Sequence, residues 1–166
     1  ISFLWPDTTN LDYIDALQNA ADGISFNNIS PIFTYSLNNG VKMMWMGDIE
    51  HDFLEKIKCN INWGEVDILF APHHGRESGK VPVDILKKLN PKVIIVGEAP
   101  AKHLDYYSGY NTITQNSAKD ITFKCEKGKV HIYVSSADYS VNYLKNEKYK
   151  SDSIGYYLGS FDTKEQ

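Results

Sequence analysis

The sequence contains only two cysteines, Cys59 and Cys125, among 166 residues. Two thiols so far apart exclude a disulfide framework and a Cys-x-x-Cys zinc site. We expect both to be free, in keeping with a reducing compartment. No apolar run approaches the roughly 20 residues of a membrane span, and no series of charged, apolar and small residues marks a signal peptide. We therefore expect a soluble chain that makes no membrane contact itself.

An excess of basic residues is also missing, since 17 Lys and Arg stand against 21 Asp and Glu. This balance excludes a protein that holds nucleic acid by charge alone, so a phosphodiester substrate would need another source of positive charge. The chain also lacks a Gly-x-Gly-x-x-Gly fingerprint, a phosphate-binding Gly-Lys-Thr loop and a Gly-x-Ser-x-Gly elbow. Nucleotide-binding and serine-hydrolase interpretations lose their main support.

The length and the 42% share of hydrophobic residues predict one globular domain with its own core. Apolar spacing alternates between strand-like and helix-like runs, which predicts an α/β (α+β) fold with a mixed sheet and flanking helices. We expect strands at 1–5, 31–37, 41–46, 67–71 and 93–96, and helices at 11–22, 49–58 and 81–89.

Two hairpins are expected, one with Asn38-Asn39-Gly40 as its loop and one at 120–135 with Glu126-Lys127-Gly128. The residues from Tyr139 on have weak periodicity, which indicates a peripheral appendage or a partly mobile segment. We therefore expect a main unit at 1–138 and a tail at 139–166. The chain begins with Ile1 inside a strand-like run, which suggests a processed or trimmed chain.

Asp48 comes directly after a predicted strand, at the strand end where α/β folds assemble their sites. A carboxylate at this point can bind one metal ion or bridge two. Asp is also a preferred N-cap, so Asp48 could instead begin the helix near Ile49. Taken alone, the capping interpretation is favoured.

Pro72-His73-His74-Gly75 is the most informative tetrapeptide, because two adjacent imidazoles follow a buried strand on a tight loop. Adjacent side chains cannot both point the same way from an extended backbone. One of His73 and His74 can therefore ligate a metal while its neighbour reaches a substrate oxygen, supports the ligand or donates a proton. A purely structural pair is the less favoured interpretation.

The other histidines are expected to be structural. His103 lies in a loop after the last apolar strand, His51 on the solvent side of a helix, and His131 within a hairpin strand. The stretch 106–111 is rich in Tyr and could form one wall of a pocket, although ordinary packing explains it about as well.

Three segments then carry a resemblance to a known family. They are Phe26-Asn27-Asn28-Ile29-Ser30-Pro31-Ile32-Phe33, Trp45-Met46-Gly47-Asp48-Ile49-Glu50, and Asp67-Ile68-Leu69-Phe70-Ala71-Pro72-His73-His74-Gly75. In this order they resemble the second half of a metallo-β-lactamase-fold hydrolase, most closely the hydrolase domain of ComEC-type competence proteins. The run 90–97 and the hairpin ending at Val134 continue the resemblance, which covers roughly residues 1 to 135.

The resemblance implies the C-terminal half of an αββα sandwich with one or two Zn²⁺ or Mn²⁺ ions that activate water. It implies Asp48 as the metal-bridging ligand, and His73 and His74 as active-site histidines of which one is a ligand. The family's upstream cluster, His-x-His-x-Asp-His, occurs nowhere in the sequence. This chain alone is therefore expected to bind metal weakly or not at all.

Two hypotheses follow. In the first, the chain is part of a metal-dependent hydrolase acting on a phosphodiester or a related ester, such as a small ester or a nucleic acid. In the second, it is a non-catalytic half-domain that binds a partner, with Asp48 as a helix cap. Either way we expect a companion, its own N-terminal half or a second copy, over apolar residues at 32–33, 43–45, 66–71 and 93–96. A free-standing protein would be cytoplasmic; one tethered to a membrane portion would not.

Overall fold

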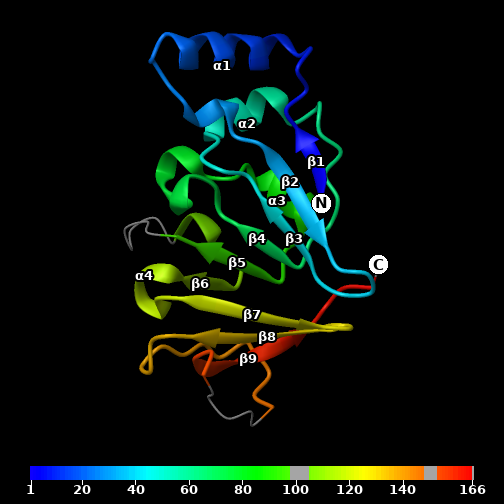
Figure 1. Ribbon diagram of the computed structural model, residues 1–166, viewed down its shortest axis with the longest axis vertical. Helices are drawn as coiled ribbons and strands as arrows, with labels where there is room; N and C mark the ends of the chain where they lie inside the picture. The colour runs from blue at the N-terminus through cyan, green and yellow to red at the C-terminus, as the bar shows by residue number, and fades with distance from the viewer. Residues whose placement is uncertain (98–104, 148–152, 166) are drawn as a thin grey trace.

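The computed structural model describes residues 1–97, 105–147 and 153–165. Its main element is a mixed sheet of six strands in chain order (Figure 1). The first two strands run antiparallel to their neighbours, and the remaining four are parallel. The strands are β1 (Ser2–Trp5), β2 (Ile32–Ser36), β3 (Lys42–Trp45), β4 (Ile68–Phe70), β5 (Val93–Val96) and β6 (Thr112–Thr114).

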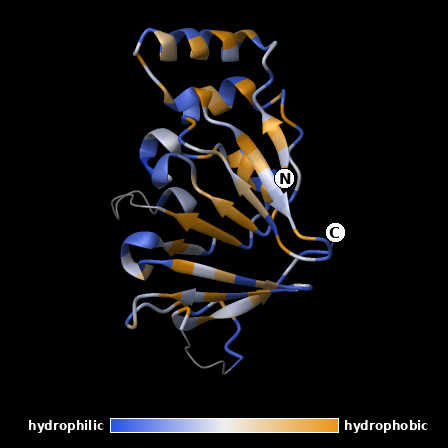
Figure 2. Ribbon diagram, in the orientation of Figure 1, coloured by the Kyte–Doolittle hydropathy of each residue, from blue (hydrophilic) through white to orange (hydrophobic). Residues whose placement is uncertain are grey.

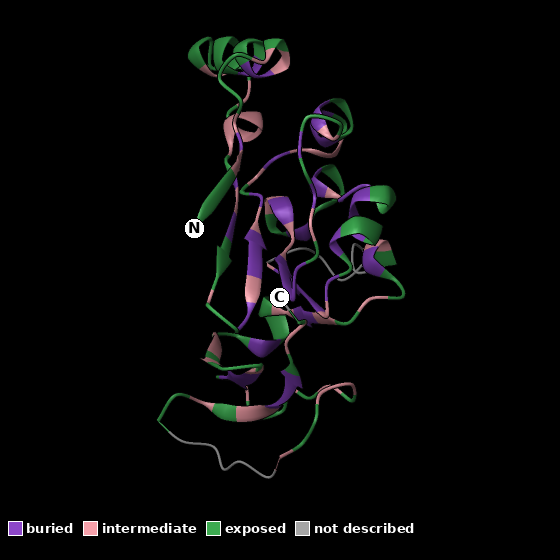
Figure 3. Cartoon of the chain, turned by 90° about the vertical axis from the view of Figure 1, so that its right-hand side faces the viewer, coloured by how far each residue is buried: buried purple, intermediate pink, exposed green. Residues whose placement is uncertain are grey.

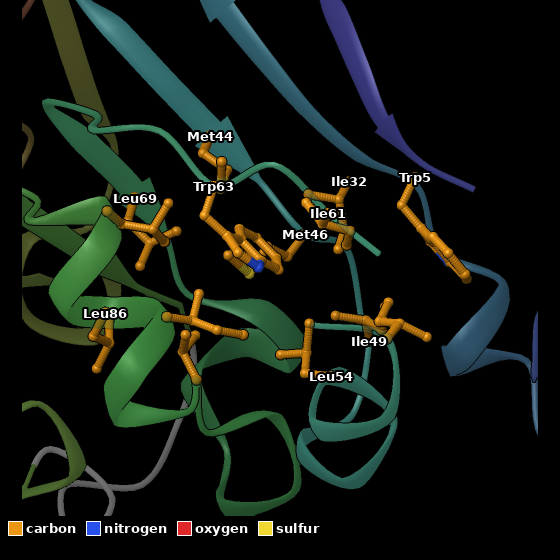
Figure 4. Close-up of a cluster of buried hydrophobic side chains, with 14 of the residues drawn as sticks. Trp5, Ile32, Met44, Met46, Ile49, Leu54, Ile61, Trp63, Leu69 and Leu86 are labelled. Atoms are coloured by element: carbon orange, nitrogen blue, oxygen red, sulfur yellow. The ribbon is translucent and has the colours of Figure 1, made fainter. Parts of the chain in front are cut away.

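Helices cover one face of this sheet, and their apolar stripes form its core with inward residues of β3, β4 and β5 (Figure 4). They are α1 (Leu11–Ala21), α2 (His51–Ile57) and α3 (Val83–Leu89). The side chain of Asn10 accepts hydrogen bonds from the backbone N–H groups of Asp12 and Tyr13, which fixes the start of α1. The expected mixed sheet with flanking helices is confirmed.

A second, three-stranded antiparallel sheet follows the short helix α4 (Gln115–Ala118). It comprises β7 (Ile121–Glu126), β8 (Lys129–Val134) and β9 (Tyr156–Asp162). The predicted hairpin is confirmed, with Gly128 in the left-handed region at φ +73°. Val130, Ile132 and Val134 of β8 pack against Met43, Ile68 and Ile95 of the first sheet, on the face opposite the helices.

The C-terminal residues are more ordered than the sequence indicates. β9 pairs along the whole of β8, and Phe161 is buried in the core between the sheets. Beyond β9, the backbone N–H of Lys164 donates to Asp67 Oδ1 at 2.8 Å, which ties this end of the chain to the start of β4. The segment 153–165 is thus an integral part of the fold, not an appendage.

The second sheet also changes the expected exposure of apolar residues. Ile32, Met43 and Met44 are buried, as are 66–69 and 93–96, because helices cover one face of the large sheet and β7–β9 cover part of the other. The expectation of an uncovered face is wrong for these residues; the rest of the expected set, Phe33, Trp45, Phe70 and Ala71, is half-buried. Figure 3 shows the exposed positions concentrated toward the outer elements. No helix in the described ranges is long and apolar enough to cross a membrane.

Candidate functional site

The candidate site lies where β3, β4 and β5 end. Because these strands are parallel, their carboxyl ends meet at one edge of the sheet, and Asp48, His74 and Gly97 each follow one of them. Loops at this edge can bring together side chains that are far apart in the sequence. The structure thus brings Asp48 and the His73–His74 pair, which follow different strands, to the same edge of the sheet.

The backbone around Asp48 is held by the segment before β2. The N–H of Asp48 donates to Ser30 Oγ at 3.0 Å. Gly47 precedes it at φ +57°, and a Cβ there would lie 2.6 Å from Ser30 Cβ, so only glycine fits beside the serine. Asp48 therefore leaves β3 in a fixed direction.

A second set of contacts involves Asn27 and Asn28, which lie in the first of the three segments that carry the family resemblance. Asn27 and Asn28 donate their side-chain N–H groups to the two carboxylate oxygens of Glu50, each at 3.1 Å. Asn28 Oδ1 in turn accepts the N–H of Glu50 at 3.0 Å. Sequence reasoning found the motif but gave these residues no role; they fix the loop that carries Asp48.

The start of α2 excludes the capping role for Asp48. The helix begins at His51, its N-cap residue is Glu50, and no side chain caps it. Asp48 lies two residues before the cap. The capping interpretation, which the sequence favours, is wrong because the chain makes a turn at Gly47–Asp48 before the helix begins.

The carboxylate of Asp48 instead faces the imidazole of His74. Asp48 Oδ1 lies 3.7 Å from His74 Nε2, and the two side chains are about half exposed. This separation is longer than a hydrogen bond, so the carboxylate and the imidazole face the same space without being bonded to each other. The pair can act together on a cation or on a polar ligand.

His73 points to a different neighbour. Its Nδ1 lies 2.9 Å from Ser78 Oγ, and its backbone N–H donates to Gly47 O at 2.9 Å. The second bond joins the loop after β4 to the loop after β3. Gly79 packs close by, since a Cβ there would lie 2.5 Å from His73 Cβ. Ser78 therefore orients one imidazole while the other faces Asp48.

The two histidines have unusual backbone conformations. His73 has φ +48° and His74 has φ +57°, and Gly75 continues the left-handed run at φ +79°. Left-handed conformations cost roughly 1–2 kcal/mol for each residue with a side chain. Such conformations cluster at active sites and ligand clamps, where the surrounding structure enforces them. The sequence contains no signal for this strain beyond the flanking Pro and Gly.

An open cavity of about 190 Å³ lies over the pair, with Trp45, Phe70 and Gln115 among its lining residues. Trp45 and Phe70 are stacked, with 4.4 Å between their ring centroids. The ladder of rings continues across the sheet through Phe33 to Phe3, which is 68% exposed at the edge strand β1. An apolar wall thus runs from the outer edge of the sheet into the cavity.

The remaining candidates lie elsewhere. His51 is half-buried, not solvent-facing, because its Nδ1 is 2.6 Å from Lys80 O. His131 is 1% exposed and lies beside the hydroxyl of Tyr157. Its structural role is in keeping with its position in β8. His103 lies outside the described residues.

The aromatic stretch 106–111 does not line the Asp48 cavity. Tyr107 is buried in the helical core. Tyr110 and Asn111 line a separate cavity of about 360 Å³ with Asn90–Val93, at the amino end of β5. Tyr106 lies beside Lys80, whose Nζ is 5.1 Å from the ring centroid. Tyr110 and Asn111 thus form part of a pocket wall, although away from Asp48 and His74, whereas Tyr106 and Tyr107 pack against other parts of the fold.

Asp48 and His74 fit part of a transition-metal site. Carboxylate and imidazole are ligands that both Zn²⁺ and Mn²⁺ accept, and a protein site for either ion needs three or four such groups. Within residues 1–97, 105–147 and 153–165, no group of three or more His, Cys, Asp or Glu side chains is arranged to hold a metal ion. Among the described residues, the donor set is therefore incomplete.

Comparison of the chain with protein-family models and with curated proteins finds no match.

Proposed function

We propose that this chain is the C-terminal half of a metallo-β-lactamase-fold hydrolase domain that cleaves a phosphodiester or a related ester. The observation that carries this proposal is the pairing of Asp48 and His74 across adjacent parallel strands, 3.7 Å apart at the floor of an open cavity. The left-handed backbone of His73 and His74 supports it, because such strain is typical of functional loops.

Asp48 and His74 would hold one or two Zn²⁺ or Mn²⁺ ions together with ligands from outside this chain. When bound, such an ion lowers the pKa of a coordinated water and stabilises charge on a phosphoryl oxygen. His73, oriented by Ser78, has its second ring nitrogen available to bind a substrate oxygen or to donate a proton to the leaving group. Trp45 and Phe70 keep one side of the cavity apolar.

We propose that the missing half of the domain packs beside β7 of the second sheet. Among the described strands, β7 pairs only with β8, so its other edge is open. Phe123 of β7 contacts Phe70 edge-on, with 6.1 Å between ring centroids, and the ladder continues from Phe70 through Trp45, Phe33 and Phe3. Strands added beyond β7 would cover these rings and complete a two-sheet sandwich. We propose that the N-terminal half of the domain, or a second copy, supplies them.

Metal binding by the 166-residue chain tests the proposal. We expect weak binding of Zn²⁺ or Mn²⁺ in calorimetric titrations, reduced at least about tenfold by Asp48→Asn or His74→Ala. Asp52→Asn, which removes an exposed carboxylate of α2, is the matched control and should leave binding unchanged. Equal affinity of Asp48→Asn, His74→Ala and the unaltered chain would overturn the assignment.

Hydrolysis requires the complete protein. We expect Asp48→Ala in that protein to abolish cleavage of bis(p-nitrophenyl) phosphate while changing thermal unfolding little, because the side chain is half exposed and forms no hydrogen bond with a described residue. A severe loss of stability with unchanged metal content would instead assign Asp48 a structural role.

A non-catalytic scaffold is the second candidate. The incomplete donor set favours it, as does the half-exposed aromatic ladder, which suits a partner as well as a substrate. Metal content separates the two candidates. A complete protein that binds no Zn²⁺ or Mn²⁺ but retains a tight partner would support the scaffold.

A further inference from the structure

Exposed apolar side chains are concentrated at one end of the molecule. Eight of the eleven large hydrophobic side chains that are exposed in the described residues lie within the first 35 positions. Five of them belong to α1 and the segment after it: Leu11, Ile14, Leu17, Ile24 and Phe26. Figure 1 places α1 at the far end from β9, and Figure 2 shows the hydrophobic positions along it.

α1 has two apolar faces. Tyr13 and Ala16 are buried in the helical core, where Trp5 packs edge-on against the Tyr13 ring. Leu11, Ile14 and Leu17 follow at intervals of three residues on the outer side, and are 76%, 46% and 43% exposed. α1 therefore has a second apolar face, in addition to the one that it buries in the core. Single exposed hydrophobic residues are ordinary, whereas three on one side of a helix form a continuous apolar strip of the kind that interaction sites use.

The charge of this end is one-sided. Residues 1–41 contain four aspartates, Asp7, Asp12, Asp15 and Asp22, and no Lys, Arg or His. The rest of the chain holds 21 − 4 = 17 acidic and 17 basic residues, so the whole net charge of −4 resides in the first 41 positions. In the described part of the chain, no ion pair reaches any of the four aspartates.

We propose that the outer face of α1, together with Ile24 and Phe26, docks an amphipathic helix whose apolar stripe is flanked by Lys or Arg. Residues spaced by three form a ridge that fits the groove of another helix. Lys56 of α2 lines a cavity with Asp12 and Asp15 but forms no ion pair with them within the described residues, so the four aspartates keep a net negative charge that favours a basic partner over an acidic one. A second copy of this chain would bring the same aspartates together, so the charge disfavours self-association through this face.

This surface is separate from the candidate hydrolase site. None of its five apolar residues lines the cavity over Asp48 and His74. α1 packs on the helical face of the large sheet, whereas the aromatic ladder lies on the opposite face. The proposal therefore does not depend on the proposed hydrolase function.

A synthetic helix can serve as the probe. A fluorescent peptide of about 18 residues, or five turns, carries Leu at the i, i+3, i+4 and i+7 positions and Lys elsewhere. The control peptide has Glu in place of every Lys. We expect the full chain to bind the Lys peptide in fluorescence anisotropy, more weakly at high salt, and not to bind the Glu peptide.

Variants locate the binding. Ile14→Asp with Leu17→Asp should lower affinity for the Lys peptide at least about tenfold, while Val83→Asp, at an exposed apolar residue of α3, should not. Asp12→Asn with Asp15→Asn leaves the apolar row intact and should reduce both the affinity and its salt dependence. The proposal is wrong if the Lys peptide does not bind, if the α1 variants bind it as well as Val83→Asp does, or if sedimentation shows a dimer that the α1 variants abolish.

Discussion

The indole of Trp45 stacks on the ring of Phe70, with 4.4 Å between centroids and 11° between planes. The two rings continue the register in which Met43 pairs with Ile68 and Met44 with Leu69. Asp48 follows Trp45 by three residues, and His74 follows Phe70 by four. A shift of one residue between these strands would move every side chain to the other face, so the stacked pair helps to fix the distance between the carboxylate and the imidazole.

Gly97 should control the position of His74. A Cβ at residue 97 would lie 3.2 Å from both Cα and Cβ of His74, tighter than ordinary van der Waals contact. We expect Gly97→Ala to weaken metal binding at Asp48–His74 several-fold and to cost about 1 kcal/mol of stability by overpacking. Gly64→Ala is the control, because its Cβ would meet only the end of the flexible Lys42 side chain. Unchanged metal binding in Gly97→Ala would show that His74 is not held by this contact.

The left-handed backbone at His74 predicts an inverted order of stability. Glycine adopts φ +57° without strain, whereas alanine keeps the penalty. His74→Gly should therefore unfold at higher denaturant concentration than His74→Ala, by about 1 kcal/mol. Lys87 is an exposed helical position of α3, and there Lys87→Ala should be more stable than Lys87→Gly. The same order at both positions would mean that His74 relaxes to a right-handed conformation in solution.

Asp67 should hold the C-terminal segment in place. This buried carboxylate accepts the backbone N–H groups of Lys42 and Lys164, each at 2.8 Å. In Asp67→Asn, the amide NH₂ group would face one of these backbone N–H donors. We therefore expect the free energy of unfolding in urea to fall by about 2 kcal/mol. Hydrogen exchange at the Lys164 amide should become faster. Glu65→Gln, at an exposed neighbour that also contacts Lys164, should have little effect; similar losses in both variants would refute a specific role for Asp67.

Local patterns in the sequence are sufficient to predict most of the first sheet and the helices that cover it. Helical spacing and short apolar runs predict α1 to α3 and β1 to β5. In α1, however, the spaced residues Leu11, Ile14 and Leu17 are exposed, and Tyr13 and Ala16 are buried instead. Parallel strands then place Asp48 and His73–His74 at one edge. The N-cap of α2 is not predictable in this way, because it depends on Ser30 holding Asp48 from 18 residues away.

The second sheet depends more on distant contacts. β9 has no regular alternation, and Gly159, at φ +144°, leaves no room for a side chain against Leu144. β6 contains only three residues, too few for a periodic pattern. The bond between Asp67 and Lys164 joins residues 97 positions apart. No local signal in the sequence indicates these contacts. Sequence patterns alone therefore predict that the C-terminal residues form a peripheral tail.

Burial of Tyr107 predicts a loss of stability at alkaline pH. Desolvation raises the pKa of its hydroxyl from 10.0 to about 12. Between these values the unfolded chain releases the proton while the folded chain retains it. The stabilising contribution of the neutral form is therefore complete below pH 10 and is lost as the pH rises toward 12. The difference between the pKa values of the unfolded and folded states corresponds to roughly 2–3 kcal/mol of unfolding free energy.

Urea unfolding at a series of alkaline pH values measures this predicted loss of stability. Burial also raises the pKa of Tyr143, so that residue contributes in the same direction. We expect Tyr107→Phe to make the fall in unfolding free energy above pH 10 shallower, because the variant has no phenol to titrate at this position. Adding Tyr143→Phe should flatten the curve further. An equally steep fall in Tyr107→Phe would mean that the ring is solvated in the folded protein, and that the core beneath α3 is more open than the structure indicates.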